Sequence, residues 1–257
     1  MNNTSNHLHK SFLLHQRPYR ETSIIADFLT DSDERVSVVC KGVKSSGKKA
    51  LLLRSILQPF GLMVLNYKGK TSLKSLLNVE PIQQPYRLVN ENLYVGLYIN
   101  EIIIRLFKTG INHNNIFSEY KKIISVLSGM SCSSDIEHKI FLEVHLRKFE
   151  FKLLSILGYE LDFFNETRNG EKIKPDGFYQ FKSSEGFSEI KNKANFEDLK
   201  KKKEFLCVVG KYIIALQKEN YKNEDVRVFA KKLSRVALLP HLGRDPIFAR
   251  QLFKNRK

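Results

Sequence analysis

The first third of the chain contains five short runs rich in β-branched, aromatic and other apolar residues, and turn residues separate them. Five such strands in about 75 residues, with a long loop between the third and the fourth, predict a small closed barrel. An OB-fold fits this pattern, and an SH3-like barrel fits it nearly as well. The runs are SFLLHQRP (11–18), TSIIADFLT (22–30), RVSVVCKG (35–42), PFGLMVLNYKG (59–69) and TSLKSLLNVEP (71–81).

After Pro85 the period of the apolar residues changes from that of strands to that of helices. Residues 86–110 carry apolar side chains on most faces, as a helix buried in a bundle does. Residues 114–128 and 135–157 predict two more helices, and the second of these opens with a capping box from Ser134 to Glu137. The sequence therefore predicts an α+β protein, with a small β-barrel domain, OB-fold or SH3-like, over 1–82 and an α-helical domain over 83–257.

The helical pattern is interrupted between about 160 and 206, where Gly, Asn, Lys and Ser are frequent. We expect an irregular inserted segment here with one hairpin, and FLCVV (205–209) is typical of a strand. Helices are expected again at 211–219, 224–239 and 247–254.

The charge of the chain is strongly positive, with 43 basic and 27 acidic residues and a formal net charge of +16. Such a charge favours a polyanionic partner, either nucleic acid or an anionic membrane. The 45 residues from Arg35 to Val79 contain no Asp or Glu. The nine basic residues of this stretch, which are our candidate DNA-binding residues, are Arg35, Lys41, Lys44, Lys48, Lys49, Arg54, Lys68, Lys70 and Lys74.

The cysteine content and the hydropathy indicate a cytoplasmic protein without a membrane partner. Cys40, Cys132 and Cys207 lie far apart, which suits a reducing compartment and argues against a disulfide framework. The N-terminal stretch has only a short apolar patch, and no run of about 18 apolar residues occurs. We therefore expect neither secretion nor membrane insertion.

The stretch KGVKSSGKKA (41–50) has glycine and lysine spacing close to that of a nucleotide-binding P-loop. A P-loop needs Ser or Thr directly after its lysine to reach Mg²⁺, but Lys49 occupies that position. A P-loop also joins a buried strand to a helix, and we expect this stretch instead to be a solvated loop between two barrel strands. Its lysines would then face the phosphates of a nucleic acid.

Other groupings of reactive side chains do not predict an enzyme. Asp31, Asp33 and Glu34 are more typical of a polar hairpin turn than of metal-binding carboxylates. His138 and His145 share a helix face but lack a third ligand on it, so no metal site is expected. Cys40 fits a strand residue better than a nucleophile, and the sequence predicts no catalytic residue and no cofactor.

Nucleic-acid binding needs cations along a groove and often exposed aromatic rings on which bases stack. Tyr67, Tyr19 and Phe12 are possible stacking platforms, although such rings are more often core residues. A second basic cluster, Lys200–Lys203, either extends the track or forms a solvated helix face, and we favour the second alternative.

Several motifs in register resemble the family of the bacterial DNA repair protein RecO. FLLHQRPYRETSIIADFLT, RVSVVCKGVKSS and ILQPFG resemble its N-terminal OB-fold. LYVGLYINEII (93–103), LRKFEFKLLSILGYELDF (146–163) and LPHLGRDPIFARQLF (239–253) resemble its helical domain in the same order. The resemblance covers nearly the whole chain. Two departures stand out, because the turn glycine usual before RVSVV is Glu34 and the four zinc-binding cysteines of many members are missing from 160–206.

The resemblance implies a recombination mediator rather than an enzyme. Such a protein binds single- and double-stranded DNA, anneals complementary strands coated by single-stranded DNA-binding protein (SSB), and helps to load RecA together with RecR. In this family the helical region also binds the C-terminal tail of SSB, which points to Arg147, Lys148 and Phe149 here. No structural zinc is expected. The alternatives left open are an RNA-binding barrel and a non-catalytic adaptor whose charge serves a protein partner.

Overall fold

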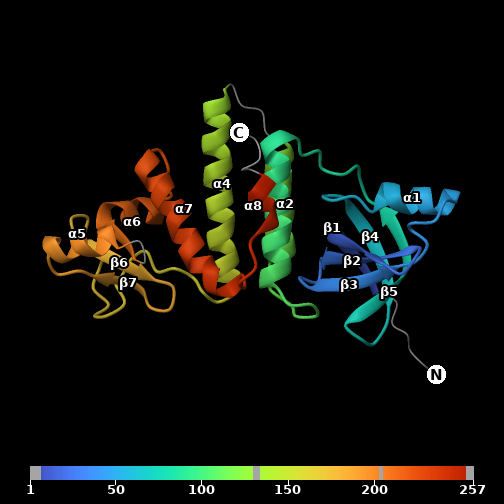
Figure 1. Ribbon diagram of the computed structural model, residues 1–257, viewed down its shortest axis with the longest axis horizontal. Helices are drawn as coiled ribbons and strands as arrows, with labels where there is room; N and C mark the ends of the chain where they lie inside the picture. The colour runs from blue at the N-terminus through green and yellow to red at the C-terminus, as the bar shows by residue number, and fades with distance from the viewer. Residues whose placement is uncertain (1–6, 130–133, 203–204, 253–257) are drawn as a thin grey trace. The chain divides into compact units, whose positions relative to one another are not determined.

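The computed structural model describes residues 7–129, 134–202 and 205–252, which belong to two compact units. The first unit combines the described residues up to 129 with 244–252, and the second contains the described residues from 134 to 243. A closed β barrel lies in the first unit and a three-stranded sheet in the second (Figure 1). The α+β class is confirmed. The period change at Pro85 therefore lies inside the first unit, which continues through two further helices.

The barrel contains the five strands that the sequence predicts, and its order is β1-β2-β3-β5-β4, closed by pairing of β1 with β4. All neighbours are antiparallel except β3 and β5, which are parallel. The parallel pair requires a crossover, and helix α1 lies in that connection between β3 and β4. The elements are β1 (His7–Tyr19), β2 (Ser23–Thr30), β3 (Arg35–Cys40), α1 (Lys48–Ile56), β4 (Leu62–Lys68) and β5 (Leu73–Pro81).

The interior of the barrel is filled by alternate residues of its strands. Ala26 and Phe28 on β2 and Val38 on β3 are fully buried there, as the period-two pattern requires. Two of the expected stacking platforms also lie in the core. Phe12 is fully buried against the rings of Phe117 and Tyr120, and Tyr67 is a member of the barrel core. The alternative that such rings are core residues is therefore confirmed for these two.

The stretch 41–50 does join a strand to a helix, so the prediction of a plain loop between two strands is wrong. Gly47 caps the N-terminus of α1, and Lys48 and Lys49 form the start of its first turn. The helix ends after Ile56, just before Pro59, as expected for a helix stopped within a few turns. The setting of a P-loop is therefore present, and what separates this stretch from one is Lys49 in place of a hydroxyl residue.

Three further helices complete the first unit: α2 (Asn90–Leu106), α3 (Ile116–Ser128) and α8 (Phe248–Leu252). The buried side chain of Asn100 on α2 joins the barrel to α3. Its amide donates to the Leu14 carbonyl on β1 at 2.9 Å, and its carbonyl accepts from the Tyr120 hydroxyl at 2.7 Å. Burial raises the pKa of Tyr120 far above its usual range, so this hydroxyl stays a donor. The barrel and these helices thus form one packed body.

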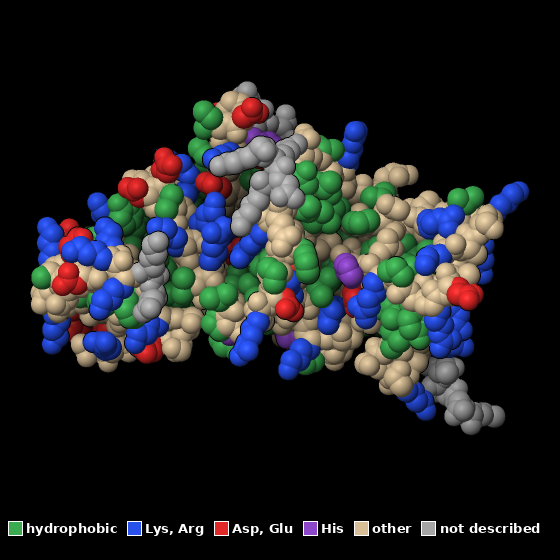
Figure 2. All heavy atoms as spheres, viewed as in Figure 1, with side chains coloured by type: hydrophobic (Ala, Val, Ile, Leu, Met, Phe, Trp, Pro, Cys, Tyr) green, Lys and Arg blue, Asp and Glu red, His purple; other side chains and the backbone are tan. Residues whose placement is uncertain are grey.

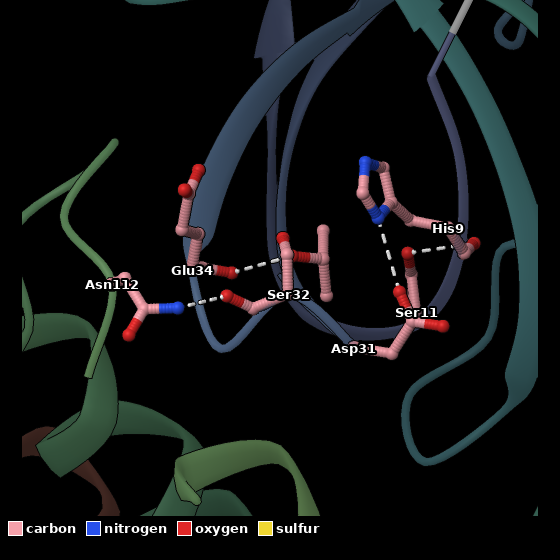
Figure 3. Close-up of polar contacts among 7 residues, drawn as sticks. His9, Ser11, Asp31, Ser32, Glu34 and Asn112 are labelled. Carbon is pink, nitrogen blue, oxygen red and sulfur yellow. Dashed lines mark hydrogen bonds and ion pairs between the residues drawn. The ribbon is translucent and has the colours of Figure 1, made fainter. Parts of the chain in front are cut away.

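The β2–β3 turn uses its acidic residues for structural contacts. Asp33, at φ 58°, is the left-handed residue of the turn. Its carboxylate accepts from the backbone N–H groups of Asn115 and Phe117, both at 2.9 Å, and so caps α3. Asp31 pairs with His9 at 3.0 Å, and Asn112 donates to the Ser32 carbonyl (Figure 3). The prediction of a polar hairpin turn is confirmed.

The segment 244–252 returns to α2 and is held there by one carboxylate. Glu101 accepts from the backbone N–H groups of Phe248 (2.9 Å) and Ala249 (2.8 Å). These groups lie at the start of α8, where the helix itself provides no acceptor. Arg105 pairs with Glu101 and donates to the carbonyls of Asp245 and Pro246, both at 2.6 Å. Glu101 and Arg105 therefore hold the segment 244–252 against α2.

Replacing Glu101 by alanine should release this segment without unfolding the barrel. Two N–H groups lose their acceptor, which costs about 1 to 2 kcal/mol of local stability. Amide hydrogen exchange at Phe248 and Ala249 should therefore become about tenfold faster or more. Glu91→Ala, at an exposed position in the first turn of α2, is the matched control and should leave exchange at these two amides unchanged.

The second unit is built around α4 (Asp135–Ile156) and a sheet of order β7-β6-β8. The expected hairpin and the FLCVV strand are present, but the segment predicted as irregular also contains helix α5. Its N-cap Asn192 accepts from the Asn195 backbone N–H, and Phe196 is its one buried residue among nine. The other elements are β6 (Phe178–Lys182), β7 (Gly186–Glu189), α5 (Lys193–Lys201), β8 (Leu206–Val209), α6 (Gly210–Gln217), α7 (Glu224–Leu238) and the 3-10 turn η1 (Leu239–His241).

The long helix α4 begins and ends where the sequence predicts. The Ser134 hydroxyl accepts from the Glu137 backbone N–H at 3.2 Å, which is one half of the expected capping box. At the other end Gly158 adopts φ 83°, and the Tyr159 N–H donates to the Leu154 carbonyl at 2.8 Å, as in a glycine-terminated helix. The first turn carries Asp135 and Glu137, whose charges favour a helix N-terminus.

Candidate nucleic-acid interface

The acid-free stretch from Arg35 to Val79 contains β3, α1, β4 and most of β5, and most of its cations are exposed. Lys41, Lys44, Lys48, Lys49, Lys68 and Lys70 are exposed, whereas Arg35, Arg54 and Lys74 are partly buried. Figure 2 shows Lys and Arg side chains over the barrel with few acidic ones among them. Lys48 and Lys49 lie in the first turn of a helix that has no acid there. Their positive charges add to the partial positive charge at the helix N-terminus. This end of α1 therefore strongly attracts anions.

Arg54 fixes the shape of the lysine-bearing loop. Its guanidinium donates to the carbonyls of Val43 (2.6 Å) and Ser45 (2.9 Å). The Ser45 hydroxyl bonds to the Gly42 carbonyl at 2.7 Å, and the Lys44 N–H bonds to Thr22 at 2.9 Å. These contacts anchor the backbone of the loop. Its lysine side chains are presented from a preorganised backbone, which lowers the entropic cost of binding.

A groove of about 380 Å³ lies beside this loop. Three cations line it, from β1 (Arg17), the loop (Lys44) and α1 (Arg54), and its walls are mainly apolar. The remaining lining residues are Gln16, Pro18, Ile24, Val43, Leu57 and Gln58. Such a surface combines phosphate-binding charge with apolar area for bases.

Arg17 is a candidate that sequence reasoning missed. It lies outside the acid-free stretch, on the outer face of the barrel beside Asp27, and its guanidinium is 3.5 Å from that carboxylate. Arg35, on the other side of Asp27, is also 3.5 Å away. Burial lowers the pKa of Arg35, Asp27 opposes this shift, and the like charge of Arg17 adds to it. The period-two placement of His15 and Arg17 on β1, opposite an acid on β2, is the signal that could have identified this face.

The residues expected at an SSB-tail site lie in the second unit with different exposure. Arg147 is 7% exposed, pairs with Glu150 at 2.8 Å and donates to the Ser234 hydroxyl on α7 at 2.8 Å. Phe149 is buried, and Lys148 is exposed and paired with Glu219. Arg147 therefore makes hydrogen bonds inside the protein. Lys148, the other cation among these three residues, is the one that reaches solvent.

The remaining candidates have structural roles where the chain is described. His145 bonds to the Phe141 carbonyl at 2.9 Å and stacks on its ring. Burial raises the pKa of the Cys40 thiol to about 12, as for a strand residue in a core. Lys200 and Lys201 are exposed on α5, and Lys203 lies outside the described residues.

The described ranges contain neither a cluster of metal ligands nor a membrane-spanning helix. Over residues 7–129, 134–202 and 205–252, no three His, Cys, Asp or Glu side chains gather closely enough to hold a metal ion. Among the helices described in these same ranges, none combines the length and apolarity that crossing a membrane requires.

A closed five-stranded barrel of OB topology, in which the stretch from Arg35 to Val79 is rich in Lys and Arg and contains no Asp or Glu, defines an OB-fold protein with a cationic barrel. Comparison with known proteins is specific. The family model "Recombination protein O N terminal" matches residues 4–85, and "Recombination protein O C terminal" matches 89–203. The chain belongs to the RecO family of DNA repair proteins.

Relatives from several bacteria match almost end to end, and each is named DNA repair protein RecO. The protein of Mannheimia succiniciproducens is 34% identical, over 94% of this chain and 96% of its own. That of Haemophilus influenzae is 33% identical over 96% and 95%, and that of Proteus mirabilis is 31% identical over 95% and 91%. The similarity to these DNA repair proteins therefore extends over nearly the whole chain.

Proposed function

We propose that this chain is a recombination mediator that binds single- and double-stranded DNA through its barrel. In this proposal it anneals complementary strands coated by SSB, and it helps RecR to load RecA in the cytoplasm. The observation that carries the proposal is the cationic, acid-free stretch from Arg35 to Val79, with Lys44, Lys48 and Lys49 presented from an anchored loop. Membership of the RecO family supports it further.

The mechanism that this surface supports is charge neutralisation. Two DNA strands repel each other through their phosphates, and lysines that neutralise part of this charge let the strands approach. The bases then pair without help from a catalytic group, so we propose that the protein is not an enzyme. The apolar walls of the groove beside Arg17 and Lys44 offer a surface that unpaired bases can contact.

Annealing should need no nucleotide. Complementary oligonucleotides precoated with SSB should pair at the same rate with and without ATP, because Lys49 stands where a P-loop has its Mg²⁺-binding hydroxyl. The measurement is the loss of fluorescence of a quencher–fluorophore strand pair. ATP hydrolysis above background in a preparation free of RecA, or annealing that depends on ATP, would contradict the proposal.

Two alternatives are separated by the same reagents. An RNA-binding barrel would bind single-stranded RNA more tightly than DNA of the same sequence, because it would use the 2′-hydroxyl groups. A protein adaptor would bind neither nucleic acid with a steep dependence on salt. For a barrel that contacts four or five phosphates, the slope of log K against log salt should be about −3.

We further propose that helix α4 receives the acidic, apolar C-terminal tail of SSB, using the residues expected there: Arg147, Lys148 and Phe149. A terminal carboxylate needs a cation next to apolar area. Lys148 is the exposed cation, whereas Arg147 already bonds to Glu150 and Ser234. Tail binding through Arg147 would therefore require this residue to share its donors.

A further inference from the structure

One carboxylate on the barrel surface gathers cations from both neighbouring strands. Asp27 lies in the middle of β2, between the core residues Ala26 and Phe28, so its side chain points to the outer face. Its direct cross-strand neighbours are His15 on β1 and Ser37 on β3. The Asp27 side chain is only 2% exposed, because the side chains around it cover the carboxylate.

The contacts of Asp27 hold two guanidinium groups on either side of it. Oδ2 is 3.5 Å from Arg17, and Oδ1 is 3.5 Å from Arg35 and accepts from the Ser37 hydroxyl. His15 is more distant, at 4.0 Å. One negative charge therefore stands between two permanent positive charges, and the cluster keeps a net charge of at least +1.

This cluster has capacity for an anion. The Arg17 side chain is 55% exposed, and within the described part of the chain the buried Arg35 Nε has no hydrogen-bond partner. Burial lowers the pKa of Arg35, the charge of Asp27 only partly offsets this shift, and the positive charge of Arg17 adds to it. A second negative charge near Arg35 would therefore be favourable. Arginine forks match the oxygens of a phosphate.

The cluster is continuous with the lysine-bearing loop. Arg17 belongs both to the Asp27 cluster and to the lining of the groove that contains Lys44 and Arg54. A strand whose phosphate lies at Arg17 can thus place its next base against the apolar walls of that groove.

We propose that Arg17 and Arg35 form a phosphate-binding pair for the backbone of single-stranded DNA, and that Asp27 is the positioning residue that holds the pair. The inference rests on the proposed DNA-binding function and adds a site to it. In this proposal the buried Asp27 strengthens the binding of a polyanion, although it carries a negative charge itself.

The test uses the sign of the effect of Asp27→Asn on affinity for a fluorescent oligothymidylate. Removing a negative charge from a DNA-binding surface should tighten binding if only net charge matters. If Asp27 orients the arginines, affinity at about 0.1 M salt should instead fall about fivefold, and the slope of log K against log salt should flatten by about 0.7 to 1.4. Arg17→Ala should produce a similar change, and in the Asp27→Asn background it should add little.

Asp31→Asn is the matched control, because Asp31 is a more exposed acid at the end of the same strand. This variant should bind as tightly as the wild type or more tightly. Melting curves, and titration of the protein with oligothymidylate at concentrations far above Kd, identify the fraction of folded, binding-competent protein. Folded Asp27→Asn protein with unchanged or tighter binding would overturn the inference, and so would a loss of active fraction at an unchanged slope. If the wild type itself binds no oligothymidylate, the proposed function fails instead.

Discussion

Replacing Lys44, Lys48 and Lys49 together by alanine should lower the affinity for single-stranded DNA about a hundredfold at 0.1 M salt, if each lysine neutralises one phosphate. The estimate follows from counterion release, since three lost contacts at about 0.7 each remove about 2 units of slope. The slope of log K against log salt should change from about −3 to about −1. A titration with labelled oligonucleotide at several salt concentrations measures both quantities.

The control for this variant removes the same charge from the other unit. Lys172, Lys191 and Lys193 are exposed lysines of the second unit, and their triple alanine variant should keep the wild-type slope. Equal losses in the two variants would mean that only net charge matters. An unchanged slope in the barrel variant would move the DNA site elsewhere.

Replacing Arg147 by alanine should destabilise the second unit by about 3 to 5 kcal/mol, because it leaves the carboxylate of Glu150 buried without its cation. The Ser234 hydroxyl also loses its donor. Thermal or urea unfolding, followed by a probe in the second unit, measures the loss. An unfolding free energy within about 1 kcal/mol of the wild type would show that the Arg147–Glu150 ion pair contributes less to stability than expected.

The double variant Arg147→Met/Glu150→Leu separates stability from tail binding. It removes both charges at similar volume, and such replacements of a buried ion pair are often neutral, so most of the stability should return. If Arg147 is the partner of the SSB tail carboxylate, this folded protein should bind a tail peptide about tenfold more weakly or worse. It should bind bare oligonucleotide normally. Normal binding of the peptide would assign the carboxylate to another cation, with Lys148 the exposed candidate.

The strands of the barrel were predictable from the sequence because short runs rich in β-branched and aromatic residues are separated by turn residues. Within β2 and β3, alternate residues such as Ala26, Phe28 and Val38 fill the core. The closure of the barrel and the parallel pairing of β3 with β5 depend on long-range contacts. Alternation within one strand carries no information about them.

The two helices that the sequence did not predict have weak local signals. Helix α1 begins with Gly47 and two lysines, which oppose a helix N-terminus. Helix α5 is short and charged and buries Phe196 alone, so no apolar stripe marks it. Packing of α1 beside the barrel through Leu57 and the Arg54 contacts overrides these poor signals.

The candidate site was predictable in its charge and less so in its geometry. The acid-free run identified the exposed lysines, but not that Arg54 bonds to the loop backbone. Arg17 was missed because it stands outside that run in the sequence and joins it only through pairing of β1 with β2. Phe12 and Tyr67 were possible platforms in the sequence, and their burial confirms the alternative that such rings are core residues.

Mapping the contacts of a photoactivatable DNA strand tests the central claim most directly. An oligothymidylate carrying 4-thiothymidine is crosslinked to the full-length protein, and the attached peptides are identified by mass spectrometry. The account predicts crosslinks in the barrel, at residues 41–58 and 66–75 and around Arg17, which disappear at high salt. Crosslinks confined to residues 134–243 would contradict it, because the barrel would then not be the DNA-binding surface.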